Sequence, residues 1–379
     1  SKKKYRYNHK MKSKILIYGA GAIGRGYLPW ILNKKAKLSY VENNANIVNF
    51  FKKNKTFHSI MIKNKKYISK KVVFEKIFSF GEESKFLNEY DLIILCAGTR
   101  SIESISQNLF SYKNKILILE NDIKCVDILK EKLNRFNNIF FGVPDVISSN
   151  TASGKIKKKY GRKSTITENG ICYVEKRLET FFDKAIFLNK KKLHDQWICK
   201  LYLHNTVHCI LAYLGHIVGL RYIHEIANLK FSKRLLNSSF SELSKLLIQK
   251  YNIDLKTIKY YSKKELSRFT NKLLFDPIDR VAREPFRKLK IDERLIGAAN
   301  KCIANGIYPK AISFGIFCAF NYKNRKDPDF NISYLKNSLN KEDFLEIALG
   351  LRKNEPVSEI LLENWNLYLS NINKLKKNK

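Results

Sequence analysis

Short apolar runs alternate with amphipathic stretches along the first part of the chain. Residues 14–18 (KILIY), 38–42 (LSYVE), 91–98 (DLIILCAG), 116–120 (ILILE) and 139–143 have the length and composition of buried strands. Helical patterns lie between them, through about Leu32, over 101–110 and over 124–134. Strands that alternate with helices indicate βαβ units around a parallel sheet. We therefore predict an α/β domain of the Rossmann type over residues 14–190, after a flexible basic segment at 1–13.

The pattern changes near residue 190. Helical periodicity then dominates, over 195–218, 239–251, 291–305, 310–320 and 341–352. This predicts an all-α C-terminal domain over residues 191–379 that ends in a frayed tail, KLKKNK. Within the first domain, the polar and basic stretch 148–169 is expected to leave the sheet.

Composition narrows the class of protein. The chain has 379 residues, of which 44% are hydrophobic and 12% aromatic, so it can build a sizeable core and is not a disordered chain. No apolar run reaches the roughly 18 residues that a membrane helix needs. The first ten residues lack the apolar stretch of a signal peptide, which leads us to expect a cytoplasmic protein without a membrane partner.

The charge balance is strongly basic, with 72 Lys+Arg against 34 Asp+Glu and a net charge of +38. One interpretation is a nucleic-acid or anionic-membrane partner. The other is a surface that tolerates lysine everywhere. The lysines are spread over the whole chain without an arginine-rich tract, which favours the second interpretation and leaves nucleic acid open. In either case a positive field favours anionic substrates.

The seven cysteines indicate neither a disulfide framework nor a metal site. Their number is odd, no C-x-x-C is present, and several lie in apolar runs, as Cys96 and Cys318 do. We expect buried free thiols in a reducing compartment. No Cys/His spacing matches a zinc site, so no metal is expected.

A glycine-rich turn follows the first strand. Gly19, Gly21 and Gly24 form a G-x-G-x-x-G motif that opens a helix, and Glu42 stands 18 residues further on, at the end of the second strand. Such glycines allow the tight turn, the approach of a pyrophosphate and helix–strand packing, while the acid binds ribose hydroxyls and repels a 2′-phosphate. The motif therefore predicts NAD rather than NADP. The alternative is a non-binding turn with a surface acid. The candidate cofactor-binding residues are Gly19, Ala20, Gly21, Ala22, Ile23, Gly24 and Glu42.

Polar residues gather on one predicted helix of the second domain. At 100° per residue, Lys200, Asn205 and His208 share a wedge of about 140°, with His204 inside it. A lysine there could remove a hydroxyl proton while the amide holds the developing oxyanion, as alcohol oxidation requires. The pKa of the lysine would have to fall toward about 7–8. The alternative is a solvated lysine beside hydrogen-bonded histidines.

Several motifs resemble the long-chain mannitol (polyol) dehydrogenase family. The stretch 19–26 (GAGAIGRG) is similar to the family opening GAGNIGRG, and Lys200, Asn205 and His208 match its K-x-x-x-x-N-x-x-H signature. Residues 276–297 (DPIDRVAREPFRKLKIDERLIG) are similar to an arginine-rich family segment, and 307–320 to the stretch after it. The resemblance covers roughly residues 14–350.

The resemblance implies an NAD-binding Rossmann-type domain followed by a helical substrate domain, and a zinc-independent, NAD(P)-dependent enzyme. It implies Lys200 as general base, Asn205 as oxyanion partner and His208 as a substrate-positioning residue. Asn121, in a pair similar to the family's E-N or D-N, would lie near the nicotinamide. Candidates for a phosphate on the substrate are Arg280, Arg283 and Arg287, the alternative being ion pairs with Asp276, Asp279, Glu284 or Asp292.

The chain departs from the family pattern in one segment. Phe141 stands where Asn or Asp is usual and Val146 replaces Arg, although Asp145 fits. Asp145 and His204, the latter an added titratable group, are further candidates for the substrate site. We expect a monomeric NAD-dependent dehydrogenase that converts a polyol phosphate, such as mannitol 1-phosphate, to fructose 6-phosphate. The alternatives are a related fructuronate- or tagaturonate-type reductase and a non-catalytic protein that binds nucleic acid.

Overall fold

The computed structural model describes residues 12–150, 152 and 154–377. The predicted flexible segment therefore lies, for residues 1–11, outside the described part of the chain. The chain divides into two compact units, Ser1–His194 and Asp195–Lys379. The first is an α/β unit and the second is helical, which confirms the predicted fold class.

The first unit is built on an eight-stranded sheet with the order β12-β11-β8-β7-β6-β1-β2-β5. Its strands are β1 (Lys14–Tyr18), β2 (Lys37–Glu42), β5 (Lys76–Ser79), β6 (Leu92–Leu95), β7 (Lys115–Ile118), β8 (Ile139–Asp145), β11 (Ile171–Glu175) and β12 (Ile186–Leu188). The strands from β8 to β5 run parallel, and β11 pairs antiparallel with β8. All residues of β6 and β8 are buried, because helices cover both faces of a parallel sheet.

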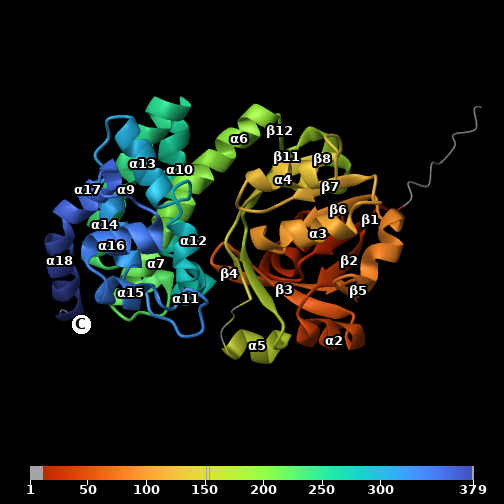
Figure 1. Ribbon diagram of the computed structural model, residues 1–379. Helices are drawn as coiled ribbons and strands as arrows, with labels where there is room; N and C mark the ends of the chain where they lie inside the picture. The colour runs from red at the N-terminus through yellow and green to blue at the C-terminus, as the bar shows by residue number, and fades with distance from the viewer. Residues whose placement is uncertain (1–11, 151, 153, 378–379) are drawn as a thin grey trace, which may run out of the picture. The chain divides into compact units, whose positions relative to one another are not determined.

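Helices follow the strands as the pattern predicted. They are η1 (Ala22–Tyr27) with α1 (Leu28–Ile31), α2 (Ala45–Lys53), η2 (Glu82–Glu89), η3 (Thr99–Ser101) with α3 (Ile102–Asn108), α4 (Lys124–Lys132) and η4 (Lys176–Phe181). α3 and α4 pack side by side on the sheet (Figure 1). Two local details differ from the prediction. The run 91–98 is a strand only over 92–95, because the chain turns away toward Gly98, whose φ is +104°. The helix after the glycine turn begins with a π-turn at Ala22.

A second sheet, with the order β4-β3-β10-β9, covers the helix that follows the glycine turn. It contains β3 (Thr56–Lys63), β4 (Lys66–Val73), β9 (Ser148–Ser149) and β10 (Thr165–Glu168), and α5 (Gly154–Tyr160) lies between the last two. The stretch 148–169 does leave the main sheet, as predicted, but it forms strands and a helix of its own. Ser148 donates a 2.6 Å hydrogen bond to the carbonyl of Ala22, and a Cβ on Gly26 would meet the Ser148 Oγ at 2.5 Å. Gly26 therefore allows the sheet to approach the helix this closely.

The second unit is a set of helices around α7 (Val207–Ile217). The other elements are the end of α6 (Lys190–Cys199), η5 (Lys200–Thr206), α8 (Ile223–Ala227), α9 (Lys230–Tyr251), α10 (Leu255–Phe269), η6 (Lys272–Leu274), α11 (Ile278–Ala282), α12 (Pro285–Lys288), α13 (Ile296–Ala304), α14 (Lys310–Ala319), α15 (Ile332–Ser338), α16 (Lys341–Asp343), η7 (Phe344–Ala348), α17 (Pro356–Glu363) and α18 (Trp365–Lys377). α7 is buried all round except at His216, as expected of a central helix. The expected frayed tail is wrong as far as Lys377, because α18 continues to that residue.

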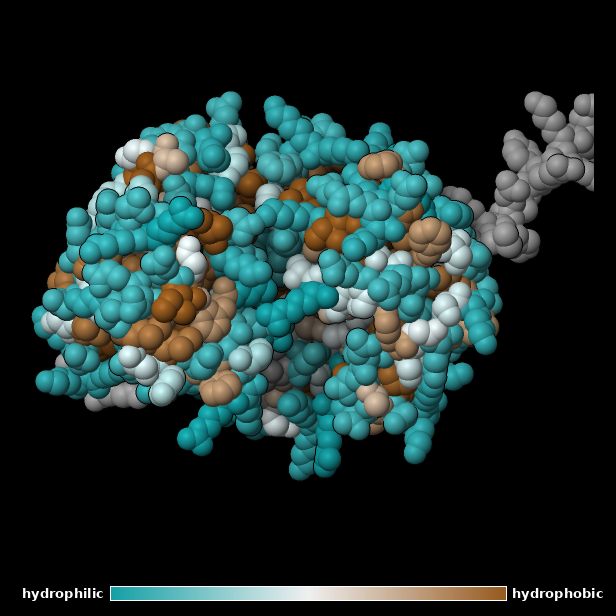
Figure 2. Space-filling model, in the orientation of Figure 1, coloured by the Kyte–Doolittle hydropathy of each residue, from teal (hydrophilic) through white to brown (hydrophobic). Residues whose placement is uncertain are grey.

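The surface matches the composition. Hydrophilic residues cover most of the face drawn in Figure 2, with hydrophobic groups between them. None of the helices in the described ranges is both long and apolar enough to cross a membrane.

Candidate functional site

The glycine turn has the shape that its spacing predicted. Gly19 has a φ of +100°, and a Cβ there would meet the carbonyl oxygen of Cys96 at 2.6 Å. A Cβ on Gly24 would come within 2.0 Å of the carbonyl oxygen of Gly19. Nothing lies within 4 Å of a Cβ on Gly21. Gly19 and Gly24 are therefore required for the turn itself, whereas Gly21 leaves its outer side open to a ligand.

Two substitutions separate these roles. Gly24→Ala should destabilise the first unit by about 3 kcal/mol or more, because the added carbon clashes with backbone that cannot move aside. Gly21→Ala should leave stability within about 0.5 kcal/mol, since its Cβ meets open space. Thermal unfolding followed by circular dichroism measures both. Equal midpoints for the two variants would contradict this account of the turn.

Glu42 lies beside the glycine turn. Its Oε2 accepts a 3.0 Å hydrogen bond from the N–H of Ala20, and its Oε1 accepts one of 3.0 Å from the N–H of Asn44. β2 pairs directly with β1, so the carboxyl ends of both strands meet at one edge of the sheet. Glu42, although distant from the turn in the sequence, therefore contacts it in the structure. Its carboxylate is partly exposed and has lone pairs left to accept hydrogen bonds from hydroxyl groups.

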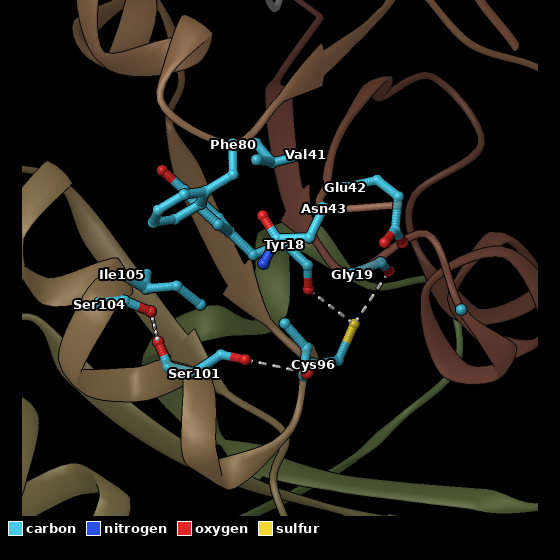
Figure 3. Close-up of a pocket in the computed structure, with 12 residues that line it drawn as sticks. Tyr18, Gly19, Val41, Glu42, Asn43, Phe80, Cys96, Ser101, Ser104 and Ile105 are labelled. Carbon is cyan, nitrogen blue, oxygen red and sulfur yellow. Dashed lines mark hydrogen bonds between the residues drawn. The ribbon is translucent and has the colours of Figure 1, made fainter. Parts of the chain in front are cut away.

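A pocket of about 540 Å³ of empty space opens at this edge (Figure 3). Its lining includes the predicted residues Gly19, Gly21 and Glu42. Residues that the sequence analysis did not identify also line it: Asn43, Phe80, Cys96, Ala97, Ser101, Ser104 and Ile105. Phe80 follows β5, a strand that the apolar pattern did not reveal, and ligands of open α/β sheets bind outside the carboxyl ends of strands. Recognition of β5 would have pointed to Phe80 as a wall of the pocket.

Arg25 is buried and stabilises the glycine turn through hydrogen bonds to backbone carbonyls. The side chain is 3% exposed, its Nε donates to the carbonyl of Ala20, and its Nη1 donates to the carbonyl of Lys163 at 2.6 Å. Its guanidinium lies 5.0 Å from the ring centre of Phe51. Burial lowers the pKa of Arg25 to about 10, so it stays charged at neutral pH. Arg25 therefore ties the glycine turn to the segment before β10.

The pair Glu120-Asn121 follows β7. Glu120 is buried, and its Oε1 accepts a 2.8 Å hydrogen bond from the N–H of Gly98. It thereby fixes the turn that carries Ala97 into the pocket. Asn121 is exposed. Its role at the nicotinamide stays a prediction.

In the second unit, the predicted lysine helix is continuous from α6 through η5 to α7. Lys200, His204, Asn205 and His208 are 6–8% exposed. Residues 200–206 form a π-helix, so the wedge calculated for an ideal α-helix is wrong here. A π-turn bonds residues five apart, which places Asn205 one turn after Lys200. Such turns are frequent at functional sites. The alternative interpretation, a solvated lysine, is wrong for Lys200, because its side chain is buried.

His204 belongs to a buried charged network. Its Nδ1 lies 2.6 Å from the Oε2 of Glu265 on α10, a residue that is 0% exposed. The Oε1 of Glu265 accepts a 2.7 Å hydrogen bond from Arg268. The ring of His204 stacks on Phe269, with 5.6 Å between ring centres. His204 was predicted as a candidate for the substrate site, but its Nδ1 contacts Glu265 inside the protein.

His208 is held in a similar way. Its Nε2 lies 2.9 Å from the Oδ2 of Asp276, and its ring stacks on Phe269 with 5.1 Å between centres. Neither of the two atoms has a well-aligned hydrogen bond within the described residues, so the contact is mainly electrostatic. Burial opposes ionisation of Asp276, but Arg280 and His208 outweigh it and hold the pKa of that carboxyl below its usual range. Asp276 thus fixes the orientation of the His208 ring.

The three arginines predicted for a substrate phosphate differ in whether they form ion pairs within the protein. Arg280 Nε donates to Asp276 Oδ1 at 2.9 Å, and Arg287 Nε donates to Glu284 at 2.9 Å. For these two, the ion pairs named as the alternative are present. Arg283 is exposed, and its guanidinium forms no ion pair within the described part of the chain. Beneath it, Lys288 donates to the carbonyls of Val281 and Arg283, and burial lowers the pKa of Lys288 to about 7.

Asp145 and Phe141 are buried in β8, and a role for Asp145 toward substrate stays a prediction. The structure describes all seven cysteines and none of them forms a disulfide; Cys96 is partly exposed and the others are buried. Within residues 12–377 apart from 151 and 153, no group of three or more His, Cys, Asp or Glu side chains could hold a metal ion.

Comparisons with known proteins agree with both units. Residues 193–360 match the family model for the mannitol dehydrogenase C-terminal domain, and residues 15–169 match that for ketopantoate reductase PanE/ApbA. A mannitol-1-phosphate 5-dehydrogenase of Caldanaerobacter subterraneus is 30% identical over 349 residues, covering 82% of this chain and 87% of its own length. One of Clostridium acetobutylicum is 28% identical over 348 residues, with 82% and 87% covered.

Solved structures show the same fold. A Pseudomonas fluorescens mannitol 2-dehydrogenase, solved as a ternary complex with NAD and D-mannitol, aligns with a TM-score of 0.74 and 12% identity over 98% of this chain and 95% of its own. A D-sorbitol dehydrogenase aligns with a TM-score of 0.63 and 14% identity over 97% and 93%. Motifs, fold and sequence identity over most of the chain lead to one conclusion: the chain belongs to the mannitol dehydrogenase family and is an oxidoreductase.

Proposed function

We propose that this protein is an NAD-dependent polyol-phosphate dehydrogenase that interconverts mannitol 1-phosphate, or a similar polyol phosphate, and fructose 6-phosphate. The observation that carries the proposal is the buried Lys200, one π-turn before the amide of Asn205 and on the same helix as the His208–Asp276 contact. This is a base, an oxyanion donor and an oriented imidazole on one rigid element.

Each side chain has a defined task in the proposed reaction. Neutral Lys200 takes the proton of the substrate hydroxyl, and in reduction its ammonium returns the proton to the carbonyl oxygen. The side-chain amide of Asn205, which makes no hydrogen bond to another side chain or to backbone within the described residues, donates to that oxygen while negative charge develops on it. His208 orients the substrate through its remaining nitrogen, because Asp276 holds the other.

The cofactor of the proposed reaction is NAD, which when bound would accept hydride from the carbon that carries the hydroxyl. The residues of the first unit fit it. The open side of Gly21 would accept the pyrophosphate, and Glu42 would bind the ribose hydroxyls and repel a 2′-phosphate. Phe80 and Ile105 would pack against the adenine. Asn121 is proposed for the nicotinamide side.

Arg283 supports a phosphorylated substrate. Its guanidinium is exposed and has no acidic partner among the described residues, so it can make the charge-assisted hydrogen bonds that a phosphate accepts. The relatives named above are mannitol-1-phosphate 5-dehydrogenases, whose substrate carries such a group. Phe141, buried where the family has an amide or acid, is the reason to test other ketoses as well.

The test is NADH oxidation by the purified protein with fructose 6-phosphate, fructose, tagaturonate and fructuronate. We expect kcat/KM for fructose 6-phosphate to exceed that for fructose by about 10- to 100-fold, the value of a charge-assisted contact. Arg283→Gln should remove most of this preference and leave turnover of fructose unchanged. Turnover of a uronate alone would contradict the phosphate part of the proposal. Absence of NADH binding would contradict the enzyme itself and favour a non-catalytic protein.

A further inference from the structure

A basic pocket lies in the second unit, formed by elements that the proposed reaction does not use. It lies between the end of α7, the segment after α14, α15 and α18, and contains about 830 Å³ of empty space. These helices can be located in Figure 1. Four side chains with a basic nitrogen line it, each from a different part of the unit: His216, Lys323, Lys336 and Lys376.

The positive charges in this pocket have no acidic counterpart among its lining residues. Within the described part of the chain, Lys323, Lys336 and Lys376 form no ion pair, whereas exposed lysines elsewhere do, such as Lys52 with Glu82. The acid that acts on His216 is Asp279, which does not line the pocket. Like charges brought together without a counter-charge repel one another, and a bound anion would relieve that repulsion.

Lys336 shows that this is more than a group of surface lysines. Its ammonium donates a 2.7 Å hydrogen bond to the Oδ1 of Asn321 and lies 5.7 Å from the ring centre of Phe317. A half-buried lysine is thus held by a neutral amide and an aromatic ring, where a carboxylate would be the usual partner. Burial, with Lys376 and Lys323, lowers the pKa of Lys336 to about 8, so most of its charge remains at pH 7.

The rest of the pocket is ordered by His216. Its Nε2 accepts a 3.0 Å hydrogen bond from the N–H of Lys323, which fixes the backbone of the segment after α14. Burial lowers the pKa of His216, and Lys323 and Lys376 add to the effect, while Asp279 opposes it. The imidazole is therefore a neutral acceptor at pH 7. The amides of Asn337 and Asn373, which also line the pocket, add hydrogen-bond donors beside the ammonium groups.

We propose that this pocket is a binding site for a phosphate dianion, either inorganic phosphate or the phosphate group of a small organic ester, distinct from the substrate site. Several ammonium and amide donors from different helices suit an anion with several oxygens. The concave shape favours a small molecule over an extended polyanion. The proposal does not depend on the proposed reaction, because it rests on residues that have no part in it.

Isothermal titration with inorganic phosphate, at ionic strength held constant with NaCl, tests the site. All proteins carry Arg283→Gln, so that the arginine proposed for the substrate does not contribute. We expect Lys323→Gln/Lys376→Gln to weaken phosphate binding by about tenfold or more. The matched control is Lys374→Gln, which removes one charge from an exposed position of the same helix outside the pocket and should change binding by less than about twofold. Both lining lysines are exposed, so folding should be unaffected.

Two arms separate the sources of the anion. Because fructose 6-phosphate can also enter the proposed substrate site, its affinity is compared with and without Lys323→Gln/Lys376→Gln. If the affinity that depends on these two lysines is at least tenfold higher for the ester than for inorganic phosphate, the pocket is assigned to esters, and a smaller difference assigns it to inorganic phosphate. Two results would overturn the proposal: no phosphate binding beyond the effect of matched NaCl, or a loss per charge removed that is the same in Lys374→Gln as in Lys323→Gln/Lys376→Gln. The second result would mean that only the general positive field is involved.

Discussion

Lys200→Met is expected to lower kcat for the ketose by about 10³- to 10⁴-fold while NADH binding stays within about twofold of wild type. Methionine fills the space of a buried, nearly linear side chain but has no amine to deliver the proton. The pocket proposed for NADH is lined by residues of the first unit, so the affinity for NADH should not change. Steady-state NADH oxidation and fluorescence titration of NADH measure the two quantities.

The control for this variant is Lys192→Met. Lys192 is an exposed residue of α6, the helix that leads into the π-helical segment, so the same change there should leave kcat within about twofold. Unfolding midpoints by circular dichroism exclude a loss of structure. Retention of more than about a tenth of wild-type kcat in Lys200→Met would rule out Lys200 as the general base.

Asp276→Asn should destabilise the protein by about 3 kcal/mol at pH 7, because breaking a buried ion pair leaves its partners uncompensated. Asp276 is 4% exposed and serves both Arg280 and His208. Since His208 loses the group that orients it, kcat should fall as well. Urea unfolding at several pH values gives the free energy of unfolding.

The pH dependence of Asp276→Asn has a definite sign. The folded-state pKa of Asp276 lies below the unfolded value of about 3.9, so its contribution is present above pH 4 and is lost as the pH falls below it. The wild type should therefore lose more stability than Asp276→Asn on acidification from pH 4.5 to 3. Asp279→Asn, a change at an exposed acid three residues away, should keep the wild-type profile. Parallel profiles for wild type and Asp276→Asn would contradict the ion pair.

The strands that the pattern revealed share one property: they are buried on both faces and so read as continuous apolar runs, as β6 and β8 do. β3 and β4 were not predicted, since β4 has exposed or half-buried residues at most positions and carries several lysines. Their pairing depends on a hairpin and on packing against the helix after the glycine turn, neither of which an apolar pattern displays.

Some features of the candidate sites could likewise be predicted from the sequence and others could not. The glycine turn could be predicted because its motif is local, and Glu42 because β2 pairs with β1 in the next βαβ unit. Lys200, Asn205 and His208 could be named from their spacing and from the family signature. The π-turn that sets the angle between these three side chains could not be predicted. It is a change of hydrogen-bond register within a helix that looks regular in the sequence.

By itself, then, the sequence determined the fold class, the two-part organisation and the local motifs, because strand burial, glycine geometry and helical spacing are properties of neighbouring residues. Only the tertiary structure decided what those residues contact. Glu265 reaches His204 across 61 positions of sequence, and Phe269 stacks on both histidines. Three lysines that form no ion pair within the described part of the chain come together from distant segments to line one pocket. Such contacts follow from helix packing, which buries some charges in pairs and leaves others without a partner, and no local pattern encodes that choice.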